Sequence, residues 1–208
     1  MHEAVHNLFM KLREKGDLLT IDEYNIKYPK VREECYFNCS AAIDDRNGFV
    51  DKGGDISRLF GALCFNLRTQ AYPFTRATRT IVVLKKPCLE LNLNTQYFTT
   101  FDTDSYNRES SFLLIKGEYI PSDATPYKLS EKESMDFVNA IISAGYNDLH
   151  PEANIRITSK GVFIIDNEIR NLKRGGLNKD DFLKLRFRFE KYLHAKALNF
   201  LDDMNLSH

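Results

Sequence analysis

The segment from Ser130 to Gly145 has the most sharply delimited local structure in this sequence. Ser130 and Glu133 have the spacing of a capping box, in which the side chain of each residue bonds the backbone N–H of the other. The apolar residues that follow recur at three- and four-residue steps: Met135, Val138, Ile141 and Ile142. Gly145 is suited to end the helix in a left-handed conformation. The pattern predicts a helix with one apolar face, which the rest of the chain must cover.

Short runs of apolar and β-branched residues predict strands elsewhere. Residues 36–54 contain the runs CSAAI and GFV on either side of the turn-forming sequence 44–48, which is typical of a hairpin. Two further runs occupy residues 80–84 and 111–115. A fourth, at residues 162–165, follows a turn and is apolar throughout, which predicts a buried strand.

Helical spacing recurs in three other segments. Apolar residues from Val5 to Leu12 precede Gly16, and residues 56–70 carry an apolar stripe after a candidate N-cap. A last helix is predicted after Asn178 and runs to about residue 197. The chain is therefore expected to contain both helices and strands.

Composition excludes several classes of protein. The 208 residues include 29 basic and 29 acidic side chains, so the formal net charge is zero and no overall field attracts nucleic acid. No apolar run approaches the roughly 20 residues that cross a bilayer, so we expect no membrane span. The 4 cysteines are irregularly spaced and no secretory signal is evident, which indicates reduced thiols and a cytoplasmic protein.

Residues 146–168 contain the side chains best suited to chemistry. Asp148 and Asn154 share one loop, and Asp166 follows the predicted strand at 162–165. Phosphoryl transfer needs a carboxylate that orients the attacking hydroxyl and oxygen ligands that hold Mg²⁺ against the phosphates. The three side chains are suited to these roles.

At these positions the sequence resembles the aminoglycoside and choline kinase branch of the protein-kinase-like superfamily. The matching residues are D-L-H-P at 148–151, N-I at 154–155 and I-I-D-N-E at 164–168. Asp166 follows Asp148 by 18 positions, as such kinases usually have it. The resemblance implies that ATP and Mg²⁺ are bound, that Asp148 and Asp166 are catalytic, and that Asn154 and Asp166 are the metal ligands.

The resemblance also assigns roles in the preceding residues. Lys52, on the second arm of the predicted hairpin, would hold the α- and β-phosphates, and Ser40 would lie in a turn over the phosphates. Residues 112–121 would form a strand and a hinge that meets adenine, with Glu118 at the nucleotide. These residues cover the part of the chain that the family uses to bind its cofactor.

The architecture that the resemblance implies is α+β, a two-lobed protein-kinase-like fold with a reduced C-terminal helical lobe. Residues 1–35 would be an N-terminal helical extension, 36–120 the small lobe and 121–208 the reduced large lobe. Only 42 residues follow Asp166, and this truncation resembles the miniature kinases that bacterial pathogens inject into host cells. A protein substrate, an activating host partner and secretion into a host cytosol are therefore further expectations.

Several departures from the family pattern favour an alternative. There is no glycine-rich loop, Tyr146 replaces the usual His, one extra residue separates Asp148 from Asn154, and the usual Asp-Phe-Gly reads D-N-E at 166–168. The predicted helix at 56–70 has no glutamate for Lys52, and Gln70 and Glu90 are the nearest substitutes. The missing glycine-rich loop and the missing glutamate permit a catalytically inactive pseudokinase that only binds a partner.

A different enzyme class uses the same chain order. Cys64, His150 and Asp166 follow one another as thiol, base and orienting carboxylate, which is a papain-like order. Cys64, however, lies inside a predicted helix beside its apolar stripe, where a thiol packs in the core. A buried, unreactive thiol is the interpretation that this position favours.

Overall fold

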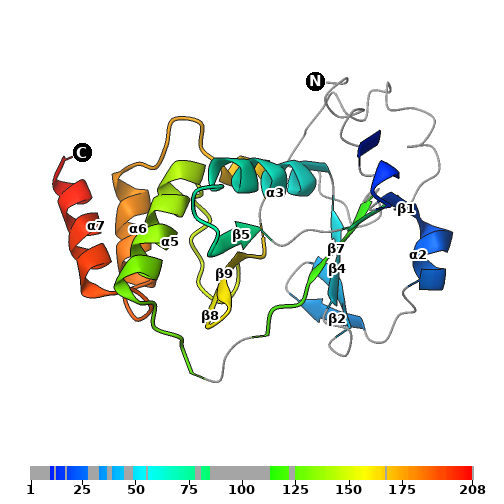
Figure 1. Cartoon of the computed structure of the whole chain (residues 1–208), viewed down its shortest axis with the longest axis horizontal. Helices are drawn as coiled ribbons and strands as arrows, with labels where there is room; N and C mark the ends of the chain where they lie inside the picture. The colour runs from blue at the N-terminus through cyan, green and yellow to red at the C-terminus, as the bar shows by residue number, and fades with distance from the viewer. Residues whose placement is uncertain are drawn as a thin grey trace. The chain divides into compact units, whose positions relative to one another are not determined.

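The computed structural model describes residues 10–11, 13–16, 18–27, 33–36, 39–44, 49–54, 56–77, 81–84, 113–121, 125–166 and 168–207. The chain divides into two compact units. The first unit comprises Met1–Ser57 and Arg79–Tyr119, and the second comprises Arg58–Thr78 and Ile120–His208. Both helices and strands are present, which confirms the α+β class (Figure 1).

The first unit is built on a six-stranded sheet with the order β1-β6-β7-β4-β3-β2. Its strands are β1 (Leu18–Thr20), β2 (Glu33–Tyr36), β3 (Cys39–Asp44), β4 (Phe49–Gly54), β6 (Ile81–Leu84) and β7 (Leu113–Glu118), and a short helix, α2 (Ile21–Lys27), follows β1. The pairs are antiparallel except for β1 with β6, which is parallel. The predicted hairpin is confirmed as β3 and β4, and the two later runs are confirmed as β6 and β7.

The expectation of a helical extension over residues 1–35 was wrong in part. Strand β1 and all but the last residue of β2 lie in this range, and these two strands form the edges of the six-stranded sheet. Such three- and four-residue strands carry little periodicity, so their pairing partners, which lie elsewhere in the chain, determine their conformation. The helix predicted from Val5 to Leu12 falls largely outside the described residues.

The second unit combines helices with a three-stranded sheet of order β5-β9-β8. Its elements are α3 (Ile56–Arg68, which begins in the first unit), β5 (Thr75–Ala77), α5 (Glu131–Ala144), β8 (Ile155–Thr158), β9 (Gly161–Ile164), the 3₁₀ turn η3 (Ile169–Asn171), α6 (Lys179–Arg188) and α7 (Ala195–Ser207). β8 and β9 form an antiparallel hairpin, and β5 adds to β9 in parallel. The predicted helix at 56–70 and the predicted strand at 162–165 are confirmed as α3 and β9.

The helix predicted after Ser130 is confirmed in detail as α5. The Ser130 backbone N–H donates to Glu133 Oε2 at 2.9 Å, and the Glu133 N–H donates to Ser130 Oγ at 3.4 Å. Gly145 follows the helix with φ 66°, and its N–H donates to Ile142 O at 3.0 Å. The capping box and the left-handed glycine therefore satisfy backbone groups that a helix end leaves unpaired.

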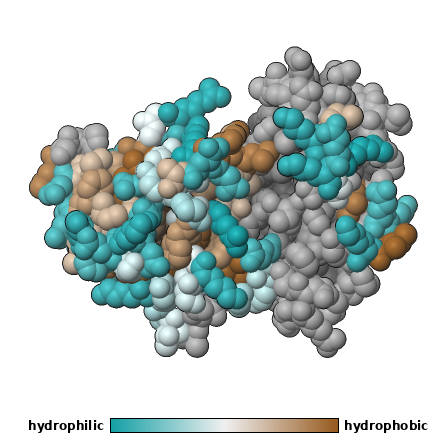
Figure 2. Space-filling view, in the orientation of Figure 1, coloured by the Kyte–Doolittle hydropathy of each residue, from teal (hydrophilic) through white to brown (hydrophobic). Residues whose placement is uncertain are grey.

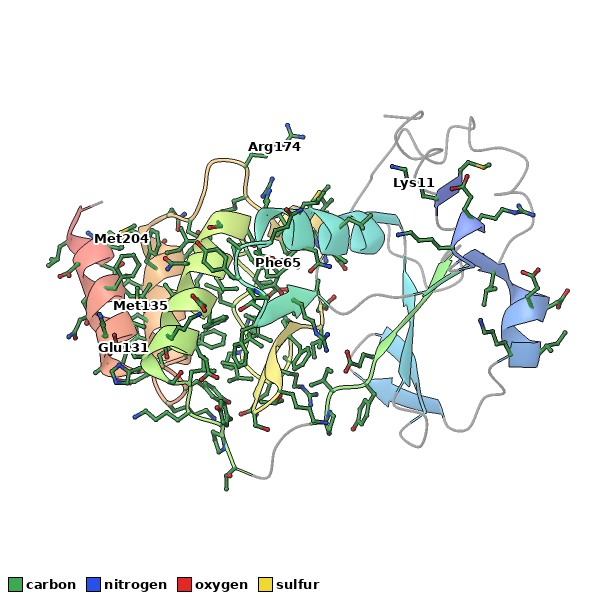
Figure 3. All side chains as sticks on the ribbon, viewed as in Figure 1. Lys11, Phe65, Glu131, Met135, Arg174 and Met204 are labelled. Atoms are coloured by element: carbon green, nitrogen blue, oxygen red, sulfur yellow. The ribbon has the colours of Figure 1, made fainter. Side chains whose placement is uncertain are left out.

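The core of the second unit lies between α5, α6, α7 and the face of the small sheet. Fully or almost fully buried apolar side chains from these elements include Phe137, Ile141, Ile155, Ile164, Leu185 and Leu201. Met135 of α5 and Met204 of α7, both labelled in Figure 3, pack against this cluster while remaining partly exposed. Hydrophilic side chains cover much of the described surface that Figure 2 shows.

The single last helix predicted after Asn178 is in fact two helices. Asn178 and Asp181 form the expected capping box of α6, but the helix ends at Arg188 and α7 starts at Ala195. The linker bonds to the start of α5 instead: Leu129 N–H donates to Tyr192 O at 2.9 Å, and His194 N–H donates to Ser134 Oγ at 2.8 Å. These tertiary bonds and the burial of linker side chains outweigh the helical spacing.

Residues 58–78 group with the second unit, whereas the sequence-based division placed them in the small lobe. Phe65 is fully buried and meets the ring of Tyr146 edge-on, with centroids 5.9 Å apart. Arg68 Nη1 donates to Ala144 O at 2.7 Å, and β5 pairs with β9. Burial, a hydrogen bond and strand pairing together attach this segment to α5 and the hairpin, and Figure 3 shows Phe65 on α3.

Every helix in the described parts of the chain is too short or too polar to cross a bilayer.

Candidate functional site

The loop that carries the predicted catalytic residues begins at a fixed point. Gly145 has a positive φ, and a Cβ at this position would collide with the backbone carbonyl of Lys173. Lys173 N–H donates to Gly145 O at 2.8 Å, and Tyr146 forms a β-bridge with Leu172. The segment after Asp166 therefore runs beside the start of the loop, and glycine is required where the two backbones approach.

Asp148 is held from three directions. Its side chain is 29% exposed, and Oδ2 accepts a hydrogen bond from Asn171 Nδ2 at 3.1 Å. Its backbone carbonyl accepts from His150 N–H at 2.9 Å and from Asn154 Nδ2 at 3.5 Å. The residue is thus a partly exposed carboxylate on a loop whose backbone is closed by its own hydrogen bonds.

Asn154 lies at the beginning of the hairpin and faces the residue before Asp166. The carbonyl of Asn154 accepts the Ile165 N–H at 2.9 Å, and this bond extends the β8–β9 ladder by one step. In an antiparallel hairpin the start of the first strand lies beside the end of the second. Asn154 and Asp166 are therefore at the same end of β8–β9, where the loop carrying Asp148 also arrives.

Asp166 is fixed through its backbone by Tyr146. The Tyr146 hydroxyl donates to Asp166 O at 2.6 Å, and the ring of Tyr146 is fully buried. Tyr146 stands where the kinases that this loop resembles usually have His, and its phenolic hydroxyl is the donor of this bond. The hydroxyl of Tyr146 therefore links the start of the loop to the end of β9.

The loop between Asp148 and Asn154 contains an unusual backbone conformation. Glu152 has φ 70°, and its N–H donates to Ile155 O at 2.8 Å. Arg156 Nε donates to the Glu152 carbonyl at 2.8 Å. A left-handed residue turns the chain sharply, and the turn returns Asn154 to within reach of the Asp148 backbone.

The side chain of Glu152 is anchored to the α6–α7 linker. Tyr192 Oη donates to Glu152 Oε1 at 2.6 Å, and Lys191 Nζ lies 3.1 Å from the same oxygen. The hydrogen bond from Tyr192, followed by that from Lys191, lowers the pKa of Glu152. Burial, followed by the bond to Glu152, raises the pKa of Tyr192. The carboxylate is thus stabilised in its charged form.

His150 and Arg188 border the same loop. His150 is 54% exposed, its Nε2 is 3.9 Å from Asp148 Oδ1, and Arg188 Nη1 lies 3.0 Å from Nε2. Arg188 Nη1 also donates to Leu149 O at 3.1 Å. A guanidinium from α6 therefore fixes the loop backbone next to the predicted catalytic carboxylate.

The oxygen atoms of the Asn154 and Asp166 side chains are of the kind that coordinates Mg²⁺. Asn154 uses its amide nitrogen toward Asp148 O, which leaves the amide oxygen as the atom able to coordinate a cation. Mg²⁺ prefers oxygen ligands and is bound by one or two carboxylates together with substrate phosphates. Across the described residues no group of three or more His, Cys, Asp or Glu side chains gathers, so a site built wholly of such protein ligands is absent there.

The three residues expected to bind the nucleotide all lie in the first unit. Lys52 is on β4, paired with Ala41 of β3 and Ile115 of β7, as the predicted hairpin requires. Glu118 is the last residue of β7 and is exposed. The roles of these residues in nucleotide binding stay predictions.

Ser40 was expected in a turn, and this placement was wrong. Ser40 lies within β3 and pairs with Cys35 of β2. The pairing of β2 with β3 begins one residue earlier, at Tyr36 and Cys39, so Ser40 lies within the strand. Of the two substitutes for the missing glutamate, Gln70 is an exposed residue after α3, and Glu90 lies outside the described residues.

Cys64 packs on the core as the sequence indicated. It lies inside α3, is partly buried, and contacts the hydrophobic cluster of the second unit. In the described part of the chain, His150 contacts Arg188 and Asp148, and no hydrogen bond joins it to Cys64. The thiol–imidazole pair that a papain-like mechanism needs is therefore not formed in this structure.

Sequence reasoning did not identify Glu152, Asn171 or Arg188 as parts of the site. Asn171 and Arg188 are distant from the motif in sequence, and a single polar residue on a turn or helix gives no signal of its contacts. Glu152 was noticed only as an extra position in the loop. A comparison of this chain with protein-family models, curated proteins and solved structures finds no match.

Proposed function

We propose that this protein is a Mg²⁺- and ATP-dependent phosphotransferase of the protein-kinase-like type, acting on a hydroxyl group of a partner protein. The proposal rests on one observation: Asp148, Asn154 and Asp166 lie at the same end of the β8–β9 hairpin. The sequence resemblance assigns these same positions to the catalytic and metal-binding roles. A two-lobed kinase fold with a reduced C-terminal lobe belongs to the same proposal.

The reaction divides into simple roles for the loop residues. The acceptor hydroxyl gives its proton to the carboxylate of Asp148, and its oxygen bonds to the γ-phosphorus of ATP. The bond between that phosphorus and the β,γ-bridging oxygen breaks, and ADP leaves with the bonding electrons. A carboxylate with this task contributes about 10²- to 10⁴-fold to the rate, mainly by orienting the hydroxyl and accepting its proton.

Asn154 and Asp166 would hold Mg²⁺, which neutralises charge on the β- and γ-phosphates. The amide oxygen of Asn154 is the atom left for this role when its nitrogen bonds Asp148 O. Tyr146 keeps the backbone of Asp166 at the end of β9. Both contacts support a metal-binding role because they restrict the positions of the ligands before the metal arrives.

The nucleotide-binding roles of Lys52, Ser40 and Glu118 complete the proposal. Lys52 would pair with the phosphates from β4, a strand that is flanked on both sides and therefore a firm support. Ser40, on β3 rather than in a turn, would approach the phosphates from its strand, and Glu118 would lie at the adenine end of β7. A host protein that activates the enzyme, and action in a cytosol, extend the same proposal.

The proposal is tested by transfer from γ-³²P-ATP to proteins of a eukaryotic lysate, and by thermal unfolding with and without millimolar Mg-ATP. Wild type should label a protein and gain thermal stability, because a ligand that binds the folded state stabilises it. Asp166→Ala should lose both effects. Asp148→Asn should lose labelling and retain the ATP-dependent shift, since its carboxylate acts mainly in the transition state.

Asp180→Asn is the matched control. Asp180 is exposed in the first turn of α6, so this change should leave labelling and the ATP-dependent shift unaltered. Equal loss of ATP binding in Asp148→Asn and Asp166→Ala would contradict the division of roles. A shift without labelling by wild type would favour a pseudokinase, and no shift at all would remove the kinase proposal.

A further inference from the structure

Asn171 makes two hydrogen bonds to consecutive residues of the catalytic loop. Its backbone carbonyl accepts the Asn147 N–H at 3.0 Å, and its side-chain Nδ2 donates to Asp148 Oδ2 at 3.1 Å. Asn171 ends η3, only five positions after Asp166. One residue therefore connects the segment that follows the proposed metal ligand to the proposed catalytic carboxylate.

The backbone around Asn171 is supported independently of its side chain. Asn171 N–H donates to Glu168 O at 2.9 Å, and Leu172 N–H donates to Ile169 O at 3.1 Å. Leu172 is bridged to Tyr146, as described above. Truncation of the Asn171 side chain thus removes the bond to Asp148 while the turn keeps its backbone bonds.

The two carboxylate oxygens of Asp148 have different surroundings. Oδ2 accepts a hydrogen bond from Asn171, whereas Oδ1 lies 3.9 Å from His150 Nε2, beyond hydrogen-bond length. Within the described residues, Oδ1 accepts no hydrogen bond. One oxygen is therefore held, and the other remains able to accept the proton of a hydroxyl group.

We infer that Asn171 is a positioning residue that holds the Asp148 carboxylate by Oδ2 and directs Oδ1 toward the acceptor hydroxyl. The inference rests on the proposed function and deepens it. An amide suits this task because it donates a hydrogen bond and carries no charge. A cationic side chain would instead form an ion pair with the carboxylate and compete with the acceptor hydroxyl for it. Aspartate at position 171 has nearly the same shape but would repel Asp148.

The test measures steady-state transfer by full-length Asn171→Ala and Asn171→Asp. Loss of a hydrogen bond to a charged group should lower kcat roughly 10- to 100-fold, with the larger loss for Asn171→Asp. KM for ATP and the ATP-dependent thermal shift should remain at wild-type values, because Asn171 contacts neither proposed metal ligand side chain. Asn199→Ala and Asn199→Asp, at an exposed position of α7, should retain wild-type kcat.

A double-mutant cycle distinguishes positioning from a structural role. If Asn171 acts through the carboxylate, Asn171→Ala should cause no further loss in an Asp148→Asn background. An additive loss in that background would overturn the inference, as would wild-type kcat in both Asn171 variants. Absence of transfer by the wild type would overturn the proposed function itself, and an active wild type with normal Asn171 variants would overturn the positioning role alone.

Discussion

Among the described residues, Glu152 is the one non-glycine residue with a positive φ. An L-residue in this region has its Cβ close to a backbone carbonyl, at a cost of about 1–2 kcal/mol. The bonds from Tyr192 and Lys191 to its carboxylate, and from Arg156 to its carbonyl, offset this strain. Side-chain anchoring and backbone conformation at this position can therefore be separated by substitution.

Glu152→Ala should be less stable than Glu152→Gly by about 1 kcal/mol, because both lose the anchor but only glycine relieves the backbone strain. Urea denaturation of both variants gives the difference. Ser143, exposed in α5, supplies the reverse control: Ser143→Gly should be less stable than Ser143→Ala by a similar amount, since glycine is unfavourable inside a helix. An alanine variant as stable as the glycine variant at 152 would contradict the left-handed conformation.

The charge of Glu152 should contribute to stability in a pH-dependent way. Its pKa in the folded protein is lowered, so the contribution is complete above the ordinary carboxyl value of 4.5 and is lost as the pH falls through the lowered pKa. Because the side chain is largely exposed, Glu152→Gln should cost only about 0.5 kcal/mol at pH 7. Denaturation at pH 7 and at about pH 3 measures the difference, and an undiminished cost in acid would refute the ion-pair explanation.

At the scale of elements, α5 and α6 start with the same device in different surroundings. Both have a capping box, formed by Ser130 with Glu133 and by Asn178 with Asp181. Glu133 is partly exposed, whereas the side chain of Asp181 is 3% exposed and also forms an ion pair with Lys173. The second box is therefore joined to the segment that borders the loop carrying Asp148.

Asp181→Ala should destabilise the protein by about 3 kcal/mol, against about 1 kcal/mol for Glu133→Ala. The larger cost arises because Lys173 loses a buried partner in addition to the lost cap. Thermal unfolding of the two variants under the same conditions compares the costs. Equal losses would mean that the Lys173 pair adds nothing to the cap.

At the scale of the whole molecule, the chain crosses between its units more than once. Residues 58–78 belong to the second unit, although they lie in the sequence between the two segments of the first. Phe65, Arg68 and β5 attach them to the second unit. The side chain of Phe65 therefore supports the second unit, where it packs against Tyr146 at the start of the loop that follows α5. Substitutions in this segment should therefore lower the stability of the second unit.

Phe65→Ala should cost about 3–5 kcal/mol, as expected when a fully buried aromatic side chain is removed. Hydrogen exchange of the full chain should then accelerate in α5 and β9 more than in β4. Phe187→Ala, at an exposed position of α6, is the control and should leave exchange unchanged in all three elements. Acceleration centred on β4 would contradict the assignment of Phe65 to the second unit.

The sequence alone was sufficient for those features that nearest neighbours in the chain determine. The capping boxes of α5 and α6, the left-handed Gly145 and the β3–β4 hairpin depend on residues within a few positions of one another, so their spacing predicts them. The same locality made Asp148, Asn154 and Asp166 recognisable as a group, because one loop and one hairpin connect them.

Tertiary structure decided the features that depend on contacts between residues far apart in the sequence. The break between α6 and α7 depends on two hydrogen bonds: the Tyr192 carbonyl accepts from Leu129 N–H, and His194 N–H donates to Ser134 Oγ of α5. These bonds outweigh an uninterrupted helical pattern. The short strands β1 and β2 form because a sheet edge offers them hydrogen bonds. The contact of Asn171 with Asp148 spans 23 positions, and only folding brings a turn residue within 3.1 Å of that carboxylate.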